Sequence, residues 1–166
     1  MRSLHPPFPI LLAAVMLLVA CGDLCGAELQ STRRSVRYLI PDGYVGWLRI
    51  DYGVNDAHAP DYGVKRALPL PVKDGAVIVE LPPGGHLVTS SPMEFGAARD
   101  EYYYSGNGSL KALSQAHDTG MVWNKFNGRF GGAATQTEFI FIGSSADYQK
   151  YGYRHETPPK HGPIKR

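Results

Sequence analysis

Hydrophobic and polar residues alternate in short runs along the middle of the chain. In the clearest run, residues 47–54, the even-numbered positions are all apolar, whereas Arg49 and Asp51 stand between them. Successive side chains of a β-strand point to opposite faces, so this pattern is typical of a strand with one buried face. We therefore predict a half-buried strand at 47–54.

Similar extended segments recur along the chain, separated by turns rich in glycine, proline and aspartate. Residues 137–143 form the most apolar of them and are expected at the centre of a sheet. A single helical turn at 146–150, capped by Ser144 or Ser145, follows it. The predicted extended segments are 36–40, 47–54, 76–81, 86–90, 101–105, 109–113, 120–126 and 137–143.

About seven short strands with frequent turns and no long amphipathic helix indicate an all-β fold. We predict a single antiparallel β-sandwich over residues 36–150, with at most one short C-terminal helical turn. After Tyr153 the chain has three prolines and almost no apolar residue, so residues 151–166 are predicted to be a disordered, basic, proline-rich tail.

The first 20 residues have the layout of a secretory signal peptide. Arg2 supplies a positive charge, and residues 10–20 are apolar and uncharged. A membrane-spanning helix needs about 20 apolar residues, so this run is too short for a stable anchor. We expect residues 1–20 to be removed on export.

The end of this run, Leu18-Val19-Ala20-Cys21, resembles the lipobox of bacterial lipoproteins. The resemblance implies that Cys21 becomes the first mature residue and carries a diacylglycerol on its thiol and a further acyl chain, such as palmitate, on its amine. Each buried methylene adds roughly 0.8 kcal/mol of membrane affinity, so several chains give a stable anchor. Residues 21–35 would then be a lipidated tether, with its arginines in solvent. Gly22, where aspartate signals inner-membrane retention, favours the outer membrane.

The alternative to lipidation is ordinary secretion. Cleavage after Ala27 would discard both cysteines and release the chain as a secreted or periplasmic protein. In either case the predicted domain has no disulfide. The net charge of +2, from 17 Lys and Arg against 15 Asp and Glu, argues against a nucleic-acid partner.

Several motifs of the predicted domain resemble a family of exported bacterial domains of unknown function. They are residues 37–47 (RYLIPDGYVGW), 68–75 (LPLPVKDG), 89–92 (TSSP) and 100–104 (DEYYY). The resemblance spans about Val36 to Tyr151 and implies an exported or lipid-anchored domain, without catalytic residues to carry over. The opening half is also similar in pattern to transthyretin-like and carboxypeptidase-regulatory-like sandwiches, which is a likeness of fold alone.

Aromatic residues provide the first candidate site. Trp47, Tyr44, Tyr102 and Tyr104 could form an exposed platform for a glycan or for another envelope protein, because such rings offer rigid contact area with polar handles. The alternative is structural: alternation buries Tyr103 while its neighbours cover the sheet, and the tryptophans fill the core.

Candidate catalytic groups are sparse. His86, His117 and Asp118 are the nucleus of any acid–base site, and no histidine or cysteine spacing fits a metal site, so we expect neither metal nor cofactor. The sequence thus favours a non-catalytic binding or structural module of the bacterial cell envelope. The alternative is a periplasmic hydrolase that uses His117 and Asp118.

Overall fold

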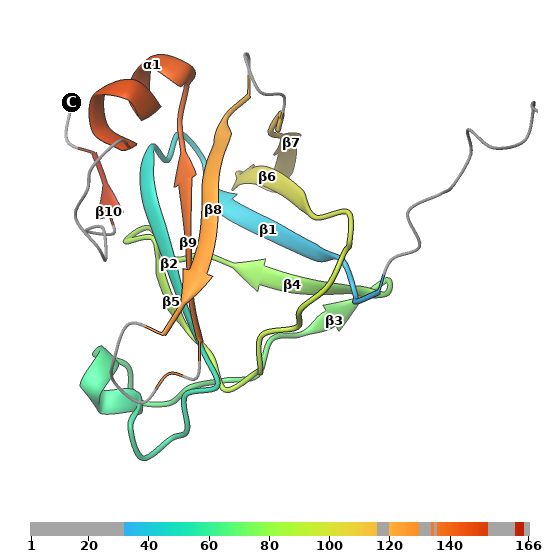
Figure 1. The fold of residues 1–166 in the computed structure, drawn as a ribbon, viewed down its shortest axis with the longest axis vertical. Helices are drawn as coiled ribbons and strands as arrows, with labels where there is room; N and C mark the ends of the chain where they lie inside the picture. Colours follow the sequence, from blue (N-terminus) through green and yellow to red (C-terminus); the bar gives the residue numbers. More distant parts are fainter. Residues whose placement is uncertain (1–31, 116–119, 130–133, 135, 153–161, 165–166) are drawn as a thin grey trace, which may run out of the picture. The chain divides into compact units, whose positions relative to one another are not determined.

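The chain folds into two β-sheets in the computed structural model, which describes residues 32–115, 120–129, 134, 136–152 and 162–164 (Figure 1). The strands are β1 (Val36–Pro41), β2 (Gly46–Tyr52), β3 (Val72–Lys73), β4 (Ala76–Glu80), β5 (His86–Val88), β6 (Glu101–Gly106), β7 (Ser109–Ala112), β8 (Val122–Gly128), β9 (Gln136–Ile142) and β10 (Gly162–Pro163). The helical elements are η1 (Ala59–Tyr62), α1 (Ser145–Asp147) and η2 (Tyr148–Gly152). The predicted signal peptide, Cys21 and the start of the tether lie outside the described residues.

The two sheets contain parallel as well as antiparallel pairs. The first has the order β3-β4-β1-β6-β7, and the second has the order β10-β2-β9-β8, with β5 also paired to β2. β1 runs parallel to both β4 and β6, and β2 runs parallel to β5. The mostly β composition is as predicted, but purely antiparallel pairing is wrong.

The turn after β1 explains the difference. The Tyr44 amide donates to the Pro41 carbonyl over 3.1 Å, so a turn follows β1 at Pro41-Asp42-Gly43, as its proline, aspartate and glycine favour. It does not return the chain beside β1, however, but carries it into the second sheet as β2. The places beside β1 are therefore filled by later strands that run in the same direction.

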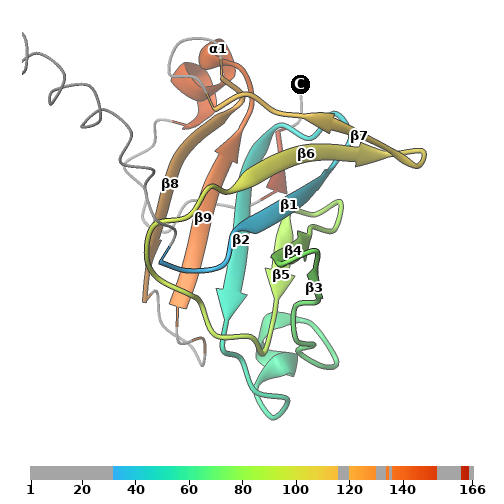
Figure 2. The same cartoon turned by 90° about the vertical axis from the view of Figure 1, so that its right-hand side faces the viewer.

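The main core lies between the sheets. Figures 1 and 2 show β1, β4 and β6 running across β2, β8 and β9. The facing side chains are almost completely buried and include Ile40, Leu48, Ile50, Ile140 and Ile142. Apolar area removed from water contributes roughly 25 cal/mol per Å², so this layer is the main source of stability.

The second sheet is also covered on its outer face. Trp47, Phe139 and Phe141 are buried there against aromatic side chains that include Tyr148 of η2. Ser144 caps α1 as predicted: its hydroxyl accepts from the Asp147 amide over 3.2 Å, and the Asp147 carboxylate accepts from the Ser144 amide over 3.1 Å. Strand β2 is thus buried on both faces, rather than half-buried as its alternation predicted.

Residues 162–164 of the predicted tail lie beside the start of β2. Gly162 and Pro163 pair with Trp47 and Gly46 as β10, and the Ile164 amide donates to the Val45 carbonyl over 2.8 Å. Gly46 has φ +143° there, and a Cβ on it would lie 2.3 Å from the Gly162 carbonyl oxygen. The glycine therefore permits the close approach of a segment that the sequence places in a disordered tail. Within the described ranges, no helix is long and apolar enough to cross a membrane.

Candidate functional site

A pocket of about 370 Å³ opens between the two sheets. Strands β1, β3 and β4 supply side chains from the first sheet, and β2, β8 and β9 supply them from the second. The segment 91–96, which precedes β6, forms a further wall. We call this cavity the Glu138 pocket, after the carboxylate at its floor, and its volume lies within the range typical of small-molecule sites.

Glu138 lies on the inner face of β9 with only 1% of its surface exposed. Its Oε2 accepts hydrogen bonds from the hydroxyls of Tyr38, at 2.9 Å, and Tyr52, at 3.1 Å. Its Oε1 lies 3.1 Å from Nζ of Lys125, which projects from β8. Burying an ion is costly unless it is paired, and here three partners on three strands surround the carboxylate.

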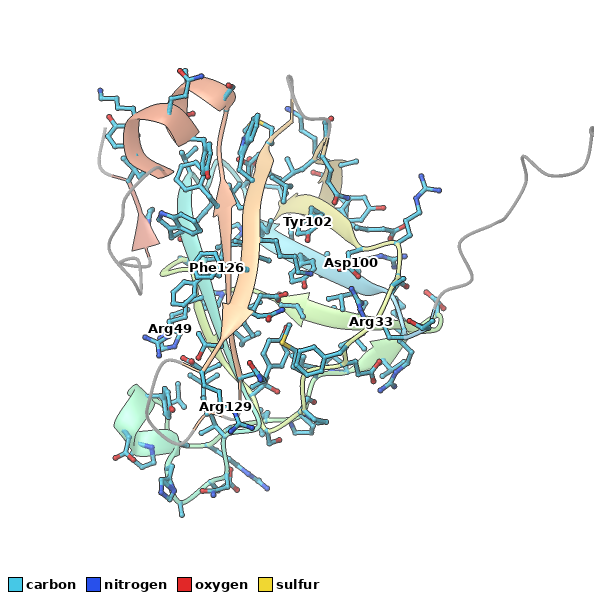
Figure 3. The ribbon with its side chains drawn as sticks, viewed as in Figure 1. Arg33, Arg49, Asp100, Tyr102, Phe126 and Arg129 are labelled. Carbon is cyan, nitrogen blue, oxygen red and sulfur yellow. The ribbon has the colours of Figure 1, made fainter. Side chains whose placement is uncertain are left out.

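Lys125 links this floor to a second carboxylate. Its ammonium donates to Asp100 Oδ2 over 2.8 Å and to the Tyr38 hydroxyl over 2.8 Å. Asp100 also accepts two hydrogen bonds from the Arg33 guanidinium, at 2.9 and 2.7 Å, and one from the Val36 amide. Figure 3 shows Arg33 and Asp100 close together on one side of the domain. The pocket is thus built around an alternating chain of two cations and two anions.

The surroundings of Lys125, Tyr38 and Tyr52 determine the protonation states of these three side chains. Burial lowers the pKa of Lys125, but attraction to Glu138 and Asp100 outweighs that effect, and the pKa is raised overall. Burial, reinforced by the charge of Glu138, raises the pKa values of Tyr38 and Tyr52 well above their usual range. The ammonium and both phenols therefore keep their protons at neutral pH.

The rest of the lining is largely apolar. Leu70, Val77 and Met93 form walls, and Val72 and Phe95 form a rim at which their side chains are 51% and 61% exposed. An ion pair between Arg34 and Glu94 lies in the same lining. We call Val72 and Phe95 the apolar rim.

The aromatic residues selected from the sequence are elsewhere. Trp47, Tyr44, Tyr102 and Tyr104 are all buried, at 8% exposure or less, and present no platform to solvent. Two of their hydroxyls bond within the fold: the Tyr104 hydroxyl donates to the Tyr44 carbonyl, and the Tyr44 hydroxyl donates to the Trp47 carbonyl, each over 2.7 Å.

The burial of alternate residues in β6 is the reverse of the structural alternative described above, in which Tyr103 is buried. Tyr102 and Tyr104 face the core, and Tyr103 is half-buried. The reason is that β6 lies beside β1 in the first sheet, and the inner face of that sheet carries Tyr38. The Tyr102 ring stacks on the Tyr38 ring with centroids 4.6 Å apart, which holds Tyr38 over the Glu138 pocket.

The candidate acid–base residues are not brought together in the described part of the chain. His86 lies on the outer face of the second sheet, with Nε2 2.7 Å from Asp51 Oδ2, and Asp51 also accepts from Thr137 over 2.6 Å. His117 and Asp118 lie outside the described residues. Among the described residues, no three His, Cys, Asp or Glu side chains gather closely enough to bind a metal ion.

Glu138, Lys125, Asp100 and Arg33 are not among the candidate residues predicted from the sequence. One signal was present, because Glu138 is the charged residue of the most apolar segment and shares its face with Ile140 and Ile142 by alternation. Arg33 gave no signal: it was placed in the solvated tether, whereas residues 32–34 are bonded to the segment 94–100.

Acid should weaken the domain through Asp100 and Asp51. Burial raises the pKa of each carboxyl, but the hydrogen bonds from Arg33 and Lys125 to Asp100, and from His86, Thr137 and Arg49 to Asp51, outweigh it and lower both pKa values overall. A lowered pKa stabilises the folded state above the unfolded value of about 3.9, and this stabilisation is lost as the pH falls through the folded value. We expect the free energy of unfolding, from urea titrations, to decrease below about pH 4.

The variant Arg33→Met tests how much Asp100 contributes to the loss of stability in acid. At neutral pH we expect a loss of about 1.5–3 kcal/mol, the usual contribution of hydrogen bonds to a charged group. The difference from wild type should shrink at a pH where Asp100 is protonated in both states, because the guanidinium then contributes mainly through its bonds to the Gly96 and Arg34 carbonyls. Arg34→Met is the matched control, because its partner Glu94 is at the surface, and it should change little. A loss in Arg33→Met that persists unchanged in acid would contradict this account.

Comparisons with known proteins agree with the fold and assign no activity. The model of a family of unknown function, DUF6843, matches residues 32–142. The crystal structure of a provisionally named lipoprotein from Bacillus anthracis has a similar fold, with a TM-score of 0.51 and 21% sequence identity over 77% of this chain and 82% of that one. No curated protein matches the chain. The family match begins at Thr32, and this is also where the described tether residues join the domain.

Proposed function

This chain belongs to the family of unknown function DUF6843, and we propose that it is a lipid-anchored protein of the bacterial cell envelope. Its domain would bind a small ligand in the Glu138 pocket without changing it chemically. The observation that carries the proposal is the pocket itself: a cavity of about 370 Å³ with apolar walls and a buried, fully paired polar floor. Cavities of this size and lining are typical of ligand sites.

The state of the floor supports binding rather than catalysis. A general base near neutral pH needs a pKa close to that pH. The pKa of Lys125 is raised, as are those of Tyr38 and Tyr52, so none of these groups is poised to accept a proton. Asp100 is held by Arg33 and Lys125. Such a network is suited to keeping the cavity open and to orienting a bound molecule.

The proposed location in the cell envelope rests on the lipobox at residues 18–21. Support comes from the Bacillus anthracis protein of similar fold, whose name describes it as a lipoprotein. Gly22 after the cysteine favours the outer membrane where the cell has one. Envelope location would place the pocket among exported proteins, glycans and lipids.

Filling the pocket should abolish binding. We expect the fluorescent apolar dye N-phenyl-1-naphthylamine to bind the full chain and to gain fluorescence, because the walls exclude water. Val77→Trp places an indole in the cavity from β4 and should weaken dye binding by about tenfold or more, equivalent to ~1.4 kcal/mol or more. Leu110→Trp, on the exposed strand β7, is the control and should bind as wild type does.

Two results would overturn the proposal. One is equal dye binding by wild type and Val77→Trp, with the latter shown to be folded by circular dichroism. The other is the absence of any saturable binding to the wild-type chain. If Val77→Trp does not fold, Leu70→Trp fills the same cavity from the loop before β3 and replaces it.

A further inference from the structure

The charged groups of the Glu138 pocket neutralise one another. Its lining contains three acids and three bases, and ion pairs join Arg33 to Asp100, Arg34 to Glu94, and Lys125 to both Asp100 and Glu138. A charged ligand would have to displace one of these partners and leave a buried ion unpaired. The pocket therefore favours a ligand without net charge in the part that enters.

Two polar groups of the lining remain available to such a ligand. Ser91 Oγ accepts from the Leu70 amide over 2.8 Å, which leaves its proton to donate. Asn127 lies opposite Glu138 in the register of β8 and β9 and also lines the pocket. Within the described part of the chain, neither this proton nor the Asn127 amide is taken up by a hydrogen bond. A hydroxyl or an ester oxygen matches these groups.

The mouth of the pocket carries the apolar rim beside the Arg34–Glu94 ion pair, and it lies where the tether joins the domain. Among the described residues, Val72 and Phe95 of the apolar rim are two of four large apolar side chains with strong exposure. Two residues after Phe95, the Ala97 carbonyl accepts from the Thr32 amide over 2.9 Å, and the Ala97 amide donates to the Thr32 hydroxyl over 2.8 Å. The chain from Cys21 to Thr32 spans at most about 40 Å when fully extended, so lipidation at Cys21 keeps this mouth within reach of a bilayer.

We propose that the ligand is a membrane lipid with an uncharged hydroxyl or ester head, such as a diacylglycerol. The head meets Ser91 and Asn127, the first carbons of the chains lie against Val77 and Met93, and the chains leave over the apolar rim toward the bilayer. This inference rests on the proposed function, because it names the ligand class of the same pocket. An amphipathic ligand fits a lining that combines polar groups with apolar walls and an apolar rim.

Photo-crosslinking tests the ligand class. The full chain with Cys21→Ser, which cannot be acylated at that position, is mixed with vesicles of phosphatidylethanolamine and phosphatidylglycerol that contain a diacylglycerol with a diazirine near its ester. After irradiation, we expect labelled peptides from the walls, around Val77 and Met93. Val77→Trp should reduce this labelling by about tenfold, and Leu110→Trp should leave it unchanged. Ser91→Ala, which barely alters the volume, should reduce it by about threefold to tenfold.

Two further crosslinking probes test whether the head of the ligand is uncharged. The same diazirine on phosphatidylglycerol, or on a free fatty acid, carries a charged head and should not label the walls. Equal labelling by either probe would overturn the choice of an uncharged head. Absence of lipid labelling, with dye binding still sensitive to Val77→Trp, would overturn the lipid inference and leave the proposed function standing. If neither lipid nor dye binds, both fail.

Discussion

Replacing Lys125 by methionine is expected to lower the free energy of unfolding by about 2 kcal/mol at neutral pH. The ammonium lies 3.1 Å from Glu138 and 2.8 Å from Asp100; the Glu138 side chain is 1% exposed, whereas the Lys125 side chain is 29% exposed, which moderates the cost. Methionine keeps the length of the side chain but leaves Glu138 with hydroxyl partners only. The cost of removing one member of a buried ion pair comes mainly from the charge left behind. Urea titration of both proteins measures the difference.

The double variant Lys125→Met with Glu138→Gln separates charge from packing. It removes both ions and keeps both side-chain shapes, so it should be more stable than Lys125→Met alone. Lys111→Met on the exposed strand β7 is the control for loss of a lysine and should stay within about 0.5 kcal/mol of wild type. If the changes in the free energy of unfolding of Lys125→Met and Glu138→Gln simply add in the double variant, Lys125 and Glu138 are not coupled. That result would contradict the view that their ion pair holds the floor of the pocket.

The local elements of this fold follow from the sequence. The Asp74-Gly75 pair has φ of +51° and +76°, as a tight hairpin turn requires, and it joins β3 to β4. The turn around Asn107 joins β6 to β7 in the same way. Alternation and turn chemistry act over a few residues, which is why these segments could be predicted from the residues themselves.

The pairing of the strands could not be predicted in the same way. The segment after Pro41 looks like one half of a hairpin, and nothing local to it indicates that β2 belongs to the other sheet. Which strand lies beside β1 depends on contacts with residues 40 to 65 positions away, such as the pairing of Tyr38 with Val79 and with Tyr102. Parallel neighbours therefore appear only once the whole chain is in place.

The candidate site likewise has one feature that the local sequence reveals and others that depend on distant residues. A glutamate within an apolar strand is visible in the sequence, and it could have been selected on the ground that a buried charge needs partners. The identity of those partners could not be predicted, because Tyr38, Lys125 and Asp100 come from separate elements. The aromatic residues, in contrast, were chosen for their chemistry alone, and the structure buries Trp47 beneath η2 and Tyr102 against Tyr38.

Replacing Cys21 by serine is expected to move almost all of the protein from the membrane pellet to the soluble fraction. The proposed anchor consists of acyl chains on this one residue, and a serine in its place has no thiol to carry the diacylglycerol. A single acyl chain binds membranes only marginally, whereas two or more anchor a protein stably. Wild type should incorporate labelled palmitate, and Cys21→Ser should not. In a host with two membranes, wild type should fractionate with the outer one.

Cys25→Ser is the matched control, because it removes the other cysteine four residues further on and should leave both membrane association and palmitate labelling unchanged. The mass of the mature chain decides between the two routes of export. Lipidation predicts a chain that begins at acylated Cys21, whereas ordinary secretion with cleavage after Ala27 predicts one that begins at Glu28. A mature chain beginning at Glu28 would contradict the anchor, and it would also remove the covalent reason for the pocket mouth to stay near a bilayer. The lipid inference would then depend on the apolar rim alone.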